Sequence, residues 1–373
     1  MLRRKGHLLR LLLAGIVLAG AFTVFVATRS SNGERSVADC PDTAMTCPGQ
    51  SAPPDDAVPP TKPGTTVPGA GSGTPVPLPT VRPPTTGSTS GGTGQPPASG
   101  PCASAAACGF PDARTTGPRT AIAAHNTGAM TVKTDGMVIK GWNITGSLDV
   151  YANNVTIIDT KITSDNWWGI NLRPGFSGLR VLHSEITAVP GKGPDNGGVD
   201  YAVSNMGESS VEVGWNDISV FGNALSMGQG NLHDNYVHDI VPFRNLGGEW
   251  QHTDAVISGG GNKGQLIIRH NTLLNATSAE QGASASIGLF ADTGVVSNTV
   301  VDGNWIAGGA YALYGGNKGA TGIKVTNNVF STQFHPKCGV YGPVTAWNAG
   351  GAGNVWSNNR MSTGVPVAAG SLV

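Results

Sequence analysis

Short apolar segments with one common pattern recur through the last two thirds of the chain. Nine segments share one template, in which an apolar residue is followed by four mostly polar or small residues and then by a second apolar residue. They occupy residues 139–144, 157–162, 181–186, 213–218, 232–237, 268–273, 301–306, 325–330 and 356–361. Apolar runs of this length between glycine turns predict β-strands, and their recurrence predicts a solenoid of stacked coils.

Asparagine, a poor strand former, occupies one position of this template again and again. The third residue after the first apolar residue is Trp142, Thr160 and Ser184, and then Asn216, Asn235, Asn271, Asn304, Asn328 and Asn359. In stacked coils these amides would lie about 4.8 Å apart and would hydrogen-bond in a ladder. Asparagine also tolerates a left-handed backbone. We therefore predict that these asparagines form a buried ladder and also bend the chain between two strands.

A second apolar segment lies between consecutive copies of the first. It reads WGI (168–170), YAV (201–203), NAL (223–225), DAV (254–256), IGL (287–289) and YAL (311–313). The whole pattern, over residues 128–362, resembles the right-handed parallel β-helix of the pectate-lyase-like superfamily. YALYGG, KCGVYGPV, GNVWSNN and CGFPDA further resemble a group of exported bacterial β-helix repeat proteins without assigned activity. The resemblance implies an all-β fold, a right-handed parallel β-helix of about nine coils, for residues 118–373.

The N-terminal part of the chain predicts export. Residues 1–30 combine basic residues with an apolar run over residues 11–27, which predicts a signal peptide or a signal-anchor. Residues 31–117 are rich in Pro, Gly, Ser and Thr and predict a disordered linker. We expect an extracellular or cell-surface monomer, secreted or anchored in the membrane by its N-terminus. The formal net charge of zero argues against a nucleic acid partner.

The five cysteines suit an exported protein, in which disulfides persist. Pairing within Cys40/Cys47 and within Cys102/Cys108 is the simplest arrangement, although the sequence alone does not fix connectivity. Cys338 is left over and is expected to be free and buried.

Four long insertions follow the second apolar residue of their repeats, at residues 187–200, 238–253, 274–286 and 331–344. Equivalent insertions leave a solenoid on one face, which is commonly the binding face. The 238–253 insertion and the residue that follows it contain the richest chemistry. We predict Arg244, His252 and Asp254 as catalytic residues, because they supply acid, base and carboxylate-binding groups. The predicted substrate-binding residues are Lys192, Tyr201, Trp250, Tyr311, His335, Lys337 and Tyr341.

These residues suggest a protein that acts on an extracellular polysaccharide, but several mechanisms stay open. QHTDAV (251–256) resembles the NTDG motif of polygalacturonases, whose aspartate is catalytic, but the next coil, SASIGLFAD, holds no adjacent aspartate pair. Inverting hydrolysis needs a second carboxyl group, so a lyase acting on a uronate-containing glycan is the better enzyme hypothesis, with a hydrolase as the other. A non-catalytic carbohydrate-binding or structural module is the rival hypothesis. No cofactor is established; Ca²⁺ held by Asp195, Asp200 or Asp239 is an option.

Overall fold

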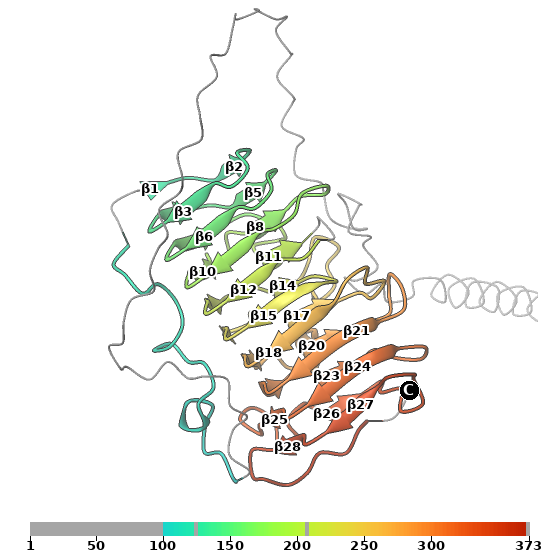
Figure 1. Ribbon diagram of the computed structural model, residues 1–373. Coiled ribbons are helices and arrows are strands. Elements are labelled where there is room, and N and C mark those ends of the chain that lie inside the picture. Colours follow the sequence, from blue (N-terminus) through green and yellow to red (C-terminus); the bar gives the residue numbers. More distant parts are fainter. Residues whose placement is uncertain (1–99, 123–125, 206–208, 371–373) are drawn as a thin grey trace, which may run out of the picture.

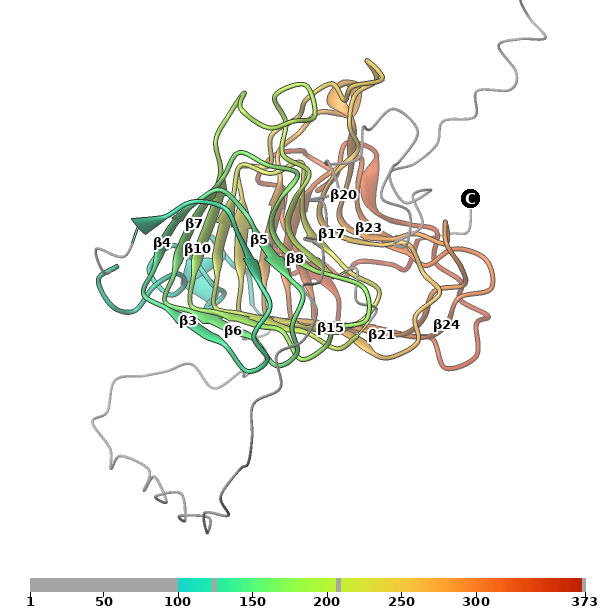
Figure 2. The same cartoon turned by 90° about the horizontal axis from the view of Figure 1, so that it is seen from above.

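The computed structural model describes residues 100–122, 126–205 and 209–370, and it is a right-handed parallel β-helix (Figure 1). Each coil contributes one strand to sheet C, then one to sheet A, then one to sheet B, and every pairing between strands is parallel. Figure 2 looks along the stack and shows the coils lying over one another. The predicted fold is confirmed. The predicted signal segment, residues 11–27, lies outside the described ranges. Within those ranges no helix is long and apolar enough to cross a membrane.

The strands are short and evenly distributed among the three sheets. Sheet C contains β3 (Val138–Lys140), β6 (Thr156–Ile158), β9 (Arg180–Leu182), β12 (Glu212–Gly214), β15 (Gly230–His233), β18 (Leu266–Arg269), β21 (Ser297–Asp302), β24 (Thr321–Thr326) and β27 (Val355–Ser357). Sheet A contains β1 (Asn126–Thr127), β4 (Asn143–Thr145), β7 (Lys161–Ser164), β10 (Glu185–Ala188), β13 (Asp217–Ser219), β16 (Tyr236–His238), β19 (Thr272–Asn275), β22 (Trp305–Gly308), β25 (Val329–Phe330) and β28 (Arg360–Met361). Sheet B contains β2 (Met130–Val132), β5 (Leu148–Val150), β8 (Trp168–Leu172), β11 (Tyr201–Asn205), β14 (Asn223–Ser226), β17 (Thr253–Ser258), β20 (Ala283–Leu289), β23 (Tyr311–Gly315) and β26 (Gly342–Thr345). Two 3₁₀ turns, η2 (Ala106–Cys108) and η3 (Ala279–Gln281), complete the list.

The core consists of apolar residues stacked in register from coil to coil. The first apolar residue of each repeat pairs with its equivalent in the next coil of sheet C, as Ile139 with Ile157 and Ile157 with Val181. All the predicted members are fully buried: Ile139, Ile157, Val181, Val213, Leu232, Ile268, Val301 and Val325. Each such side chain contributes roughly 1.5–3 kcal/mol on burial. The second apolar residues stack in sheet A in the same way.

The predicted asparagine ladder is present at the corner between sheets C and A. Asn271 illustrates it: its Nδ2 donates to Asn304 Oδ1 in the next coil (3.0 Å) and to the Leu232 carbonyl in the preceding coil (3.0 Å). Its Oδ1 accepts from both the backbone N–H and the Nδ2 of Asn235 (2.9 Å each). The same bonds link Asn216 through Asn359, and Ser184 extends the ladder by donating its N–H to Asn216. Each amide therefore spans three coils.

The prediction that the asparagine itself bends the chain is wrong. The residue with a left-handed backbone is the one immediately before each ladder position, for example His183, Trp215 and His270, with φ of 45°, 57° and 52°. Asn216 and its equivalents do not have a positive φ. The two tasks are separated because the ladder amide must point into the corner, whereas the bend leaves the preceding side chain outside. For a bulky residue such as Trp215 this conformation costs of order 1–3 kcal/mol.

Residues 100–122, which we call the strap, run along sheet A from the last coil towards the first (Figure 1). The Cys102 N–H donates to the Ser362 carbonyl in the last coil, at 2.6 Å. The Gly117 N–H donates to the Trp215 carbonyl further back, at 2.9 Å, and Arg119 forms a bidentate ion pair with Asp159. The strap thus ties successive coils together along one edge.

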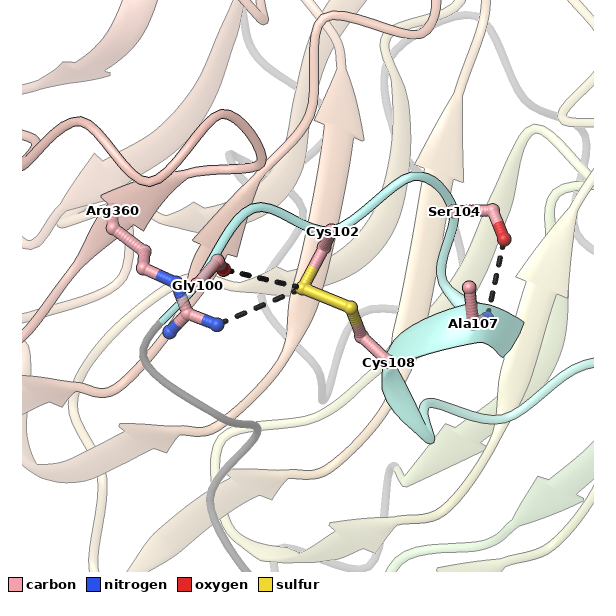
Figure 3. The surroundings of a disulfide bond; sticks show 6 residues. All are labelled: Gly100, Cys102, Ser104, Ala107, Cys108 and Arg360. Carbon is pink, nitrogen blue, oxygen red and sulfur yellow. Dashed lines mark hydrogen bonds between the residues drawn. A yellow bond between two sulfur atoms is a disulfide. The ribbon is translucent and has the colours of Figure 1, made fainter.

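The middle of the strap is apolar and buried. Phe110, only 2% exposed, packs against Trp305 (ring centroids 5.7 Å apart) and His270 (5.8 Å). The Cys102–Cys108 disulfide closes the loop that precedes it, beside Arg360 of the last coil (Figure 3). The local pairing of these two cysteines is thereby confirmed, as is the free, buried state of Cys338. Cys40 and Cys47 lie outside the described residues.

The predicted boundary between linker and β-helix at residues 117 and 118 differs from the structure. The sequence predicts a linker over residues 100–117, yet these residues carry the disulfide and bury Phe110 against sheet A. Their Pro, Gly and Ser content is typical of a linker, and one aromatic residue, Phe110, is enough to fix them on sheet A. The remainder of the predicted linker that lies before residue 100 is outside the described residues.

Replacement of Asn271 by alanine is expected to destabilise the protein strongly. The change removes the donor to the Leu232 carbonyl and leaves two donors of Asn235 without an acceptor. Each unsatisfied buried group costs about 1–3 kcal/mol. Urea denaturation followed by circular dichroism measures the loss. The matched control is Asn143→Ala, because the half-buried Asn143 makes a single side-chain bond, to Asn126. Equal unfolding midpoints for the two variants would contradict a stabilising ladder.

Replacement of Phe110 by alanine is expected to loosen the strap while the β-helix stays folded. Loss of a buried phenylalanine costs about 3–5 kcal/mol, and here that loss falls on contacts between strap and sheet. Trypsin cleavage after Arg114, whose side chain is 81% exposed, is expected to accelerate at least tenfold. Phe176→Ala, a phenylalanine that instead packs with Tyr151, is the control. Equal cleavage of both variants would show that Phe110 does not hold the strap.

Candidate functional site

All four long insertions leave the helix between sheets A and B. They connect β10 to β11, β16 to β17, β19 to β20 and β25 to β26. Figure 2 shows loops of several coils rising together from this side of the stack. The expectation that the insertions emerge at one corner is therefore confirmed, and the outer face of sheet B begins at that corner.

One row of residues runs along this face, parallel to the helix axis. Trp168, Tyr201, Asn223 and Asp254 pair in register on consecutive strands β8, β11, β14 and β17. They stand outside the apolar core cluster, whereas the alanines that follow the last three of them belong to it. Beyond Asp254 the row continues with Ala285, and Tyr311 pairs with Gly342 at its far end. We call these residues the sheet B row.

Asp254 is a fully buried carboxyl group in this row. Neither carboxylate oxygen has a hydrogen-bond partner of ordinary geometry, and the Ala285 N–H is the only group that favours the charged form. Burial raises the pKa of Asp254 well above its ordinary value of 3.8, and the carboxylate of Asp292 raises it further. A shift in this direction favours the protonated form of the carboxyl group, which is the form that can donate a proton.

An aromatic group lies next to Asp254. Tyr311 lies 5.7 Å from Tyr314 and 5.8 Å from Tyr341 between ring centroids, and Phe290 lies 5.0 Å from Tyr314. Burial raises the pKa of Tyr314 to about 12, and the negative charge of Asp254 contributes in the same direction. Tyr341 is 58% exposed, so the group presents open ring surface to solvent beside a buried acid.

Arg244 and Trp250 form a unit of their own at the tip of the 238–253 insertion. Arg244 lies over the Trp250 ring at 4.7 Å and donates to the Gly248 carbonyl at 2.7 Å. The two residues also pair across a small hairpin. The guanidinium is engaged by its own loop, so the structure gives no contact between Arg244 and Asp254.

The other predicted residues are distributed around the corner. His252 is half-buried two residues before Asp254, and its carbonyl accepts from Asn223 Nδ2 at 3.1 Å. Lys192 and Lys337 are exposed on separate loops. His335 is half-buried, and its neighbour Phe334 packs on the cluster that contains Trp305, on sheet A rather than sheet B. The three predicted tyrosines are found along the row or next to it: Tyr201 and Tyr311 belong to the row, and Tyr341 lies beside Tyr311.

Two buried aspartates, both named above as possible calcium ligands, anchor the 238–253 insertion. Asp195 Oδ1 accepts the Leu246 N–H at 2.7 Å, and Asp200 Oδ1 accepts from Gln251 Nε2 at 2.6 Å. Asp239 is engaged elsewhere, with His238 at 2.8 Å. Across residues 100–122, 126–205 and 209–370 there is no cluster of three or more potential metal-ligating side chains.

Sequence reasoning missed Asp292, Tyr314 and Phe290. Asp292 ends the SASIGLFAD segment, in which an adjacent aspartate pair was sought, and a single aspartate after the strand did not match that pattern. Tyr314 follows YAL in the same repeat, three residues after Tyr311. Tyr314 is half-buried after two consecutive fully buried residues, Ala312 and Leu313. Simple alternation along a strand does not predict this.

Comparisons with models of protein families, with curated proteins and with solved structures find no match to this chain.

Replacement of Asp200 by asparagine is expected to stabilise the protein as pH rises. Burial and the nearby Asp195 raise the pKa of Asp200 well above 3.8. Below pH 3.8 both folded and unfolded states are protonated at this site; above it, the unfolded state releases a proton that the folded state retains, so stability falls with pH. Asparagine keeps the acceptor for Gln251 without the penalty. Thermal melts from pH 3 to pH 8 measure the difference.

The control for this experiment is Asp165→Asn, which makes the same change of charge at an exposed residue. The difference between Asp200→Asn and the wild type is expected to grow with pH, while Asp165→Asn stays close to the wild type. A difference for Asp200→Asn that is constant over the whole pH range would contradict a raised pKa.

Proposed function

We propose that the protein is an extracellular glycan-active enzyme that hydrolyses a glycosidic bond between uncharged sugars on the outer face of sheet B. The observation that carries the proposal is Asp254, a buried acid without a basic partner in the middle of the sheet B row. A linear polymer laid along the helix axis meets Trp168 and Tyr201 on one side of Asp254 and Tyr311 on the other. Aromatic rings flanking a few polar groups are the usual lining of sugar sites.

Hydrolysis is favoured over β-elimination because of the charges around Asp254. An eliminating enzyme stabilises a uronate carboxylate with cations. The groups that shift the pKa of Asp254 are the Ala285 amide and Asp292, and none of them is basic. The one arginine of the predicted catalytic set, Arg244, is held by Gly248 and Trp250.

The proposed roles follow from this environment. Asp254 is the general acid that protonates the leaving oxygen, because burial raises its pKa and so favours the protonated form. Asp292, an exposed carboxylate that acts on Asp254 electrostatically, is the general base for the attacking water. Two further residues border the site: His252, in the loop directly before β17, and Asn223, on the preceding strand β14. Since Asp254 is closed to solvent, a bound glycan has to displace the side chains that cover it.

A non-catalytic carbohydrate-binding module is the second candidate, and the closed state of Asp254 favours it. In this case the exposed Tyr341 and the half-buried Tyr311 bind sugar rings, and the protonated Asp254 is only part of the wall. The two candidates share the sheet B row and differ in whether a proton is transferred.

Replacement of Asp254 by asparagine separates the two candidates. We expect at least a hundredfold loss of turnover, the usual scale for an acid–base group, together with an unchanged or higher melting point at pH 7, since a raised pKa penalises the folded state. Release of reducing ends from neutral polysaccharides and absorbance of unsaturated products are measured side by side. Asp165→Asn is the control for lost charge.

Full turnover in Asp254→Asn would overturn the catalytic assignment. If no polymer is cleaved by the wild type, while Tyr341→Ala weakens binding of the same polymers, the binding-module candidate replaces the enzyme. Accumulation of unsaturated products would identify a lyase and refute hydrolysis.

A further inference from the structure

The first strands of the sheet B row carry a second group of polar and aromatic side chains, separate from Asp254. Arg173 directly follows β8, and its guanidinium carbon lies 5.2 Å from the Tyr151 ring and 5.5 Å from the Trp168 ring. Arg173 is 7% exposed and Trp168 is 9% exposed. Arginine in contact with two rings is fixed in position, so the direction of its remaining donors is set by the fold.

Two N–H donors of this group are buried without an acceptor. Arg173 Nε and Trp168 Nε1 have no hydrogen-bond partner. A buried donor left unpaired is destabilising, and native proteins rarely keep two of them close together without a reason. Both groups only donate, so the missing partner is an acceptor.

The charge of Arg173 is only partly compensated. Its Nη1 lies 3.4 Å from Asp149 Oδ1, a long contact for a charge-assisted hydrogen bond. Asp149 engages this terminal nitrogen and leaves the Nε edge of the guanidinium unpaired. A guanidinium with an unpaired N–H, lying 5.5 Å from the ring of an indole whose N–H is also unpaired, favours an oxyanion over a neutral hydroxyl.

We propose that Arg173 and Trp168 form a subsite for an anionic substituent of the glycan, a carboxylate or a sulfate ester. The inference rests on the proposed function in taking the sheet B row as the path of the polymer. Trp168 lies three strands from Asp254 in that row, about 14 Å away at the usual strand spacing. The substrate is therefore an acidic heteropolysaccharide, with an uncharged unit at Asp254 and a charged unit several sugars away.

Tyr151 controls access to this subsite. It is the most exposed member of the group, at 37%, and it contacts both Arg173 and the edge of Phe176, 6.0 Å away. The donor atoms themselves are closed to solvent. Rotation of the Tyr151 ring away from the guanidinium admits the anion, and the ring then remains beside the sugar that carries it.

Calorimetric titration of the full chain with three linear hexasaccharides tests the subsite. The probes are a galacturonate hexamer, the same hexamer reduced to neutral galactose, and a sulfated galactan hexamer. We expect one or both anionic probes to bind at least about tenfold more tightly than the neutral one, the scale of a hydrogen bond to a charged group. Which anionic probe binds more tightly identifies the substituent.

Arg173→Gln is expected to abolish this preference. The matched control is Arg180→Gln, which removes an arginine paired with Glu212 on sheet C and is expected to retain it. Should Arg173→Gln fail to fold, Asp149→Asn serves instead: removal of the competing carboxylate is expected to tighten binding of the anionic probe. Equal binding of all three probes, or equal losses in Arg173→Gln and Arg180→Gln, would overturn the proposal.

Cleavage is measured independently of this preference. If Arg173→Gln loses the preference while no probe or polymer is cleaved, the subsite stands and the hydrolase proposal fails. If neutral polymers are cleaved in an Asp254-dependent manner but no probe shows a charge preference, the hydrolase stands and the subsite fails.

Discussion

The corner between sheets C and A makes the whole stack depend on a continuous line of buried amides. A parallel β-helix must turn its chain sharply in every coil, and each turn buries backbone groups that no strand partner reaches. Asn216 through Asn359 supply the missing donors and acceptors, with each amide serving its own coil and both neighbours. Because every member depends on the next, the six coils from Asn216 to Asn359 keep this one side chain while their loops vary, and the three earlier coils have Trp142, Thr160 and Ser184 in its place.

The same corner explains why its outer surface is polar and aromatic. The left-handed residues interact with one another, since His183 stacks on Trp215 at 4.8 Å and Asp234 accepts from His270 at 2.6 Å. Asp234 also accepts from the buried His233 that precedes it, at 2.8 Å. Hydrogen bonds to these histidines hold the pKa of Asp234 at about 2, although burial opposes the shift. These contacts offset the backbone strain at the bend, and histidines within the repeats are therefore structural residues.

The fold was predictable from the sequence because its determinants occupy fixed positions of a template that recurs along the chain. Ile139 and its equivalents occur in all nine repeats, and the asparagine two residues before the second apolar residue occurs in six of them. The site has no such redundancy. Arg244, His252 and Asp254 are close in sequence, yet a hairpin turns Arg244 back on Trp250, while Asp292 of the following coil affects Asp254 electrostatically. Loop geometry and irregular strand pairing decide those contacts, and neither has a periodic signature. The strap was missed for the same reason, since Phe110 is a single residue.

The course of the strap determines how the molecule bears mechanical load. Its first residues meet the last coil and its final residues meet an early coil, so a pull exerted through the chain before residue 100 peels the strap from sheet A one contact at a time. Peeling requires far less force than shearing a sheet, since the bonds break in sequence rather than together. The Cys102–Cys108 disulfide carries tension past the turn at η2. Under such a pull the strap therefore detaches from sheet A before the stacked coils separate.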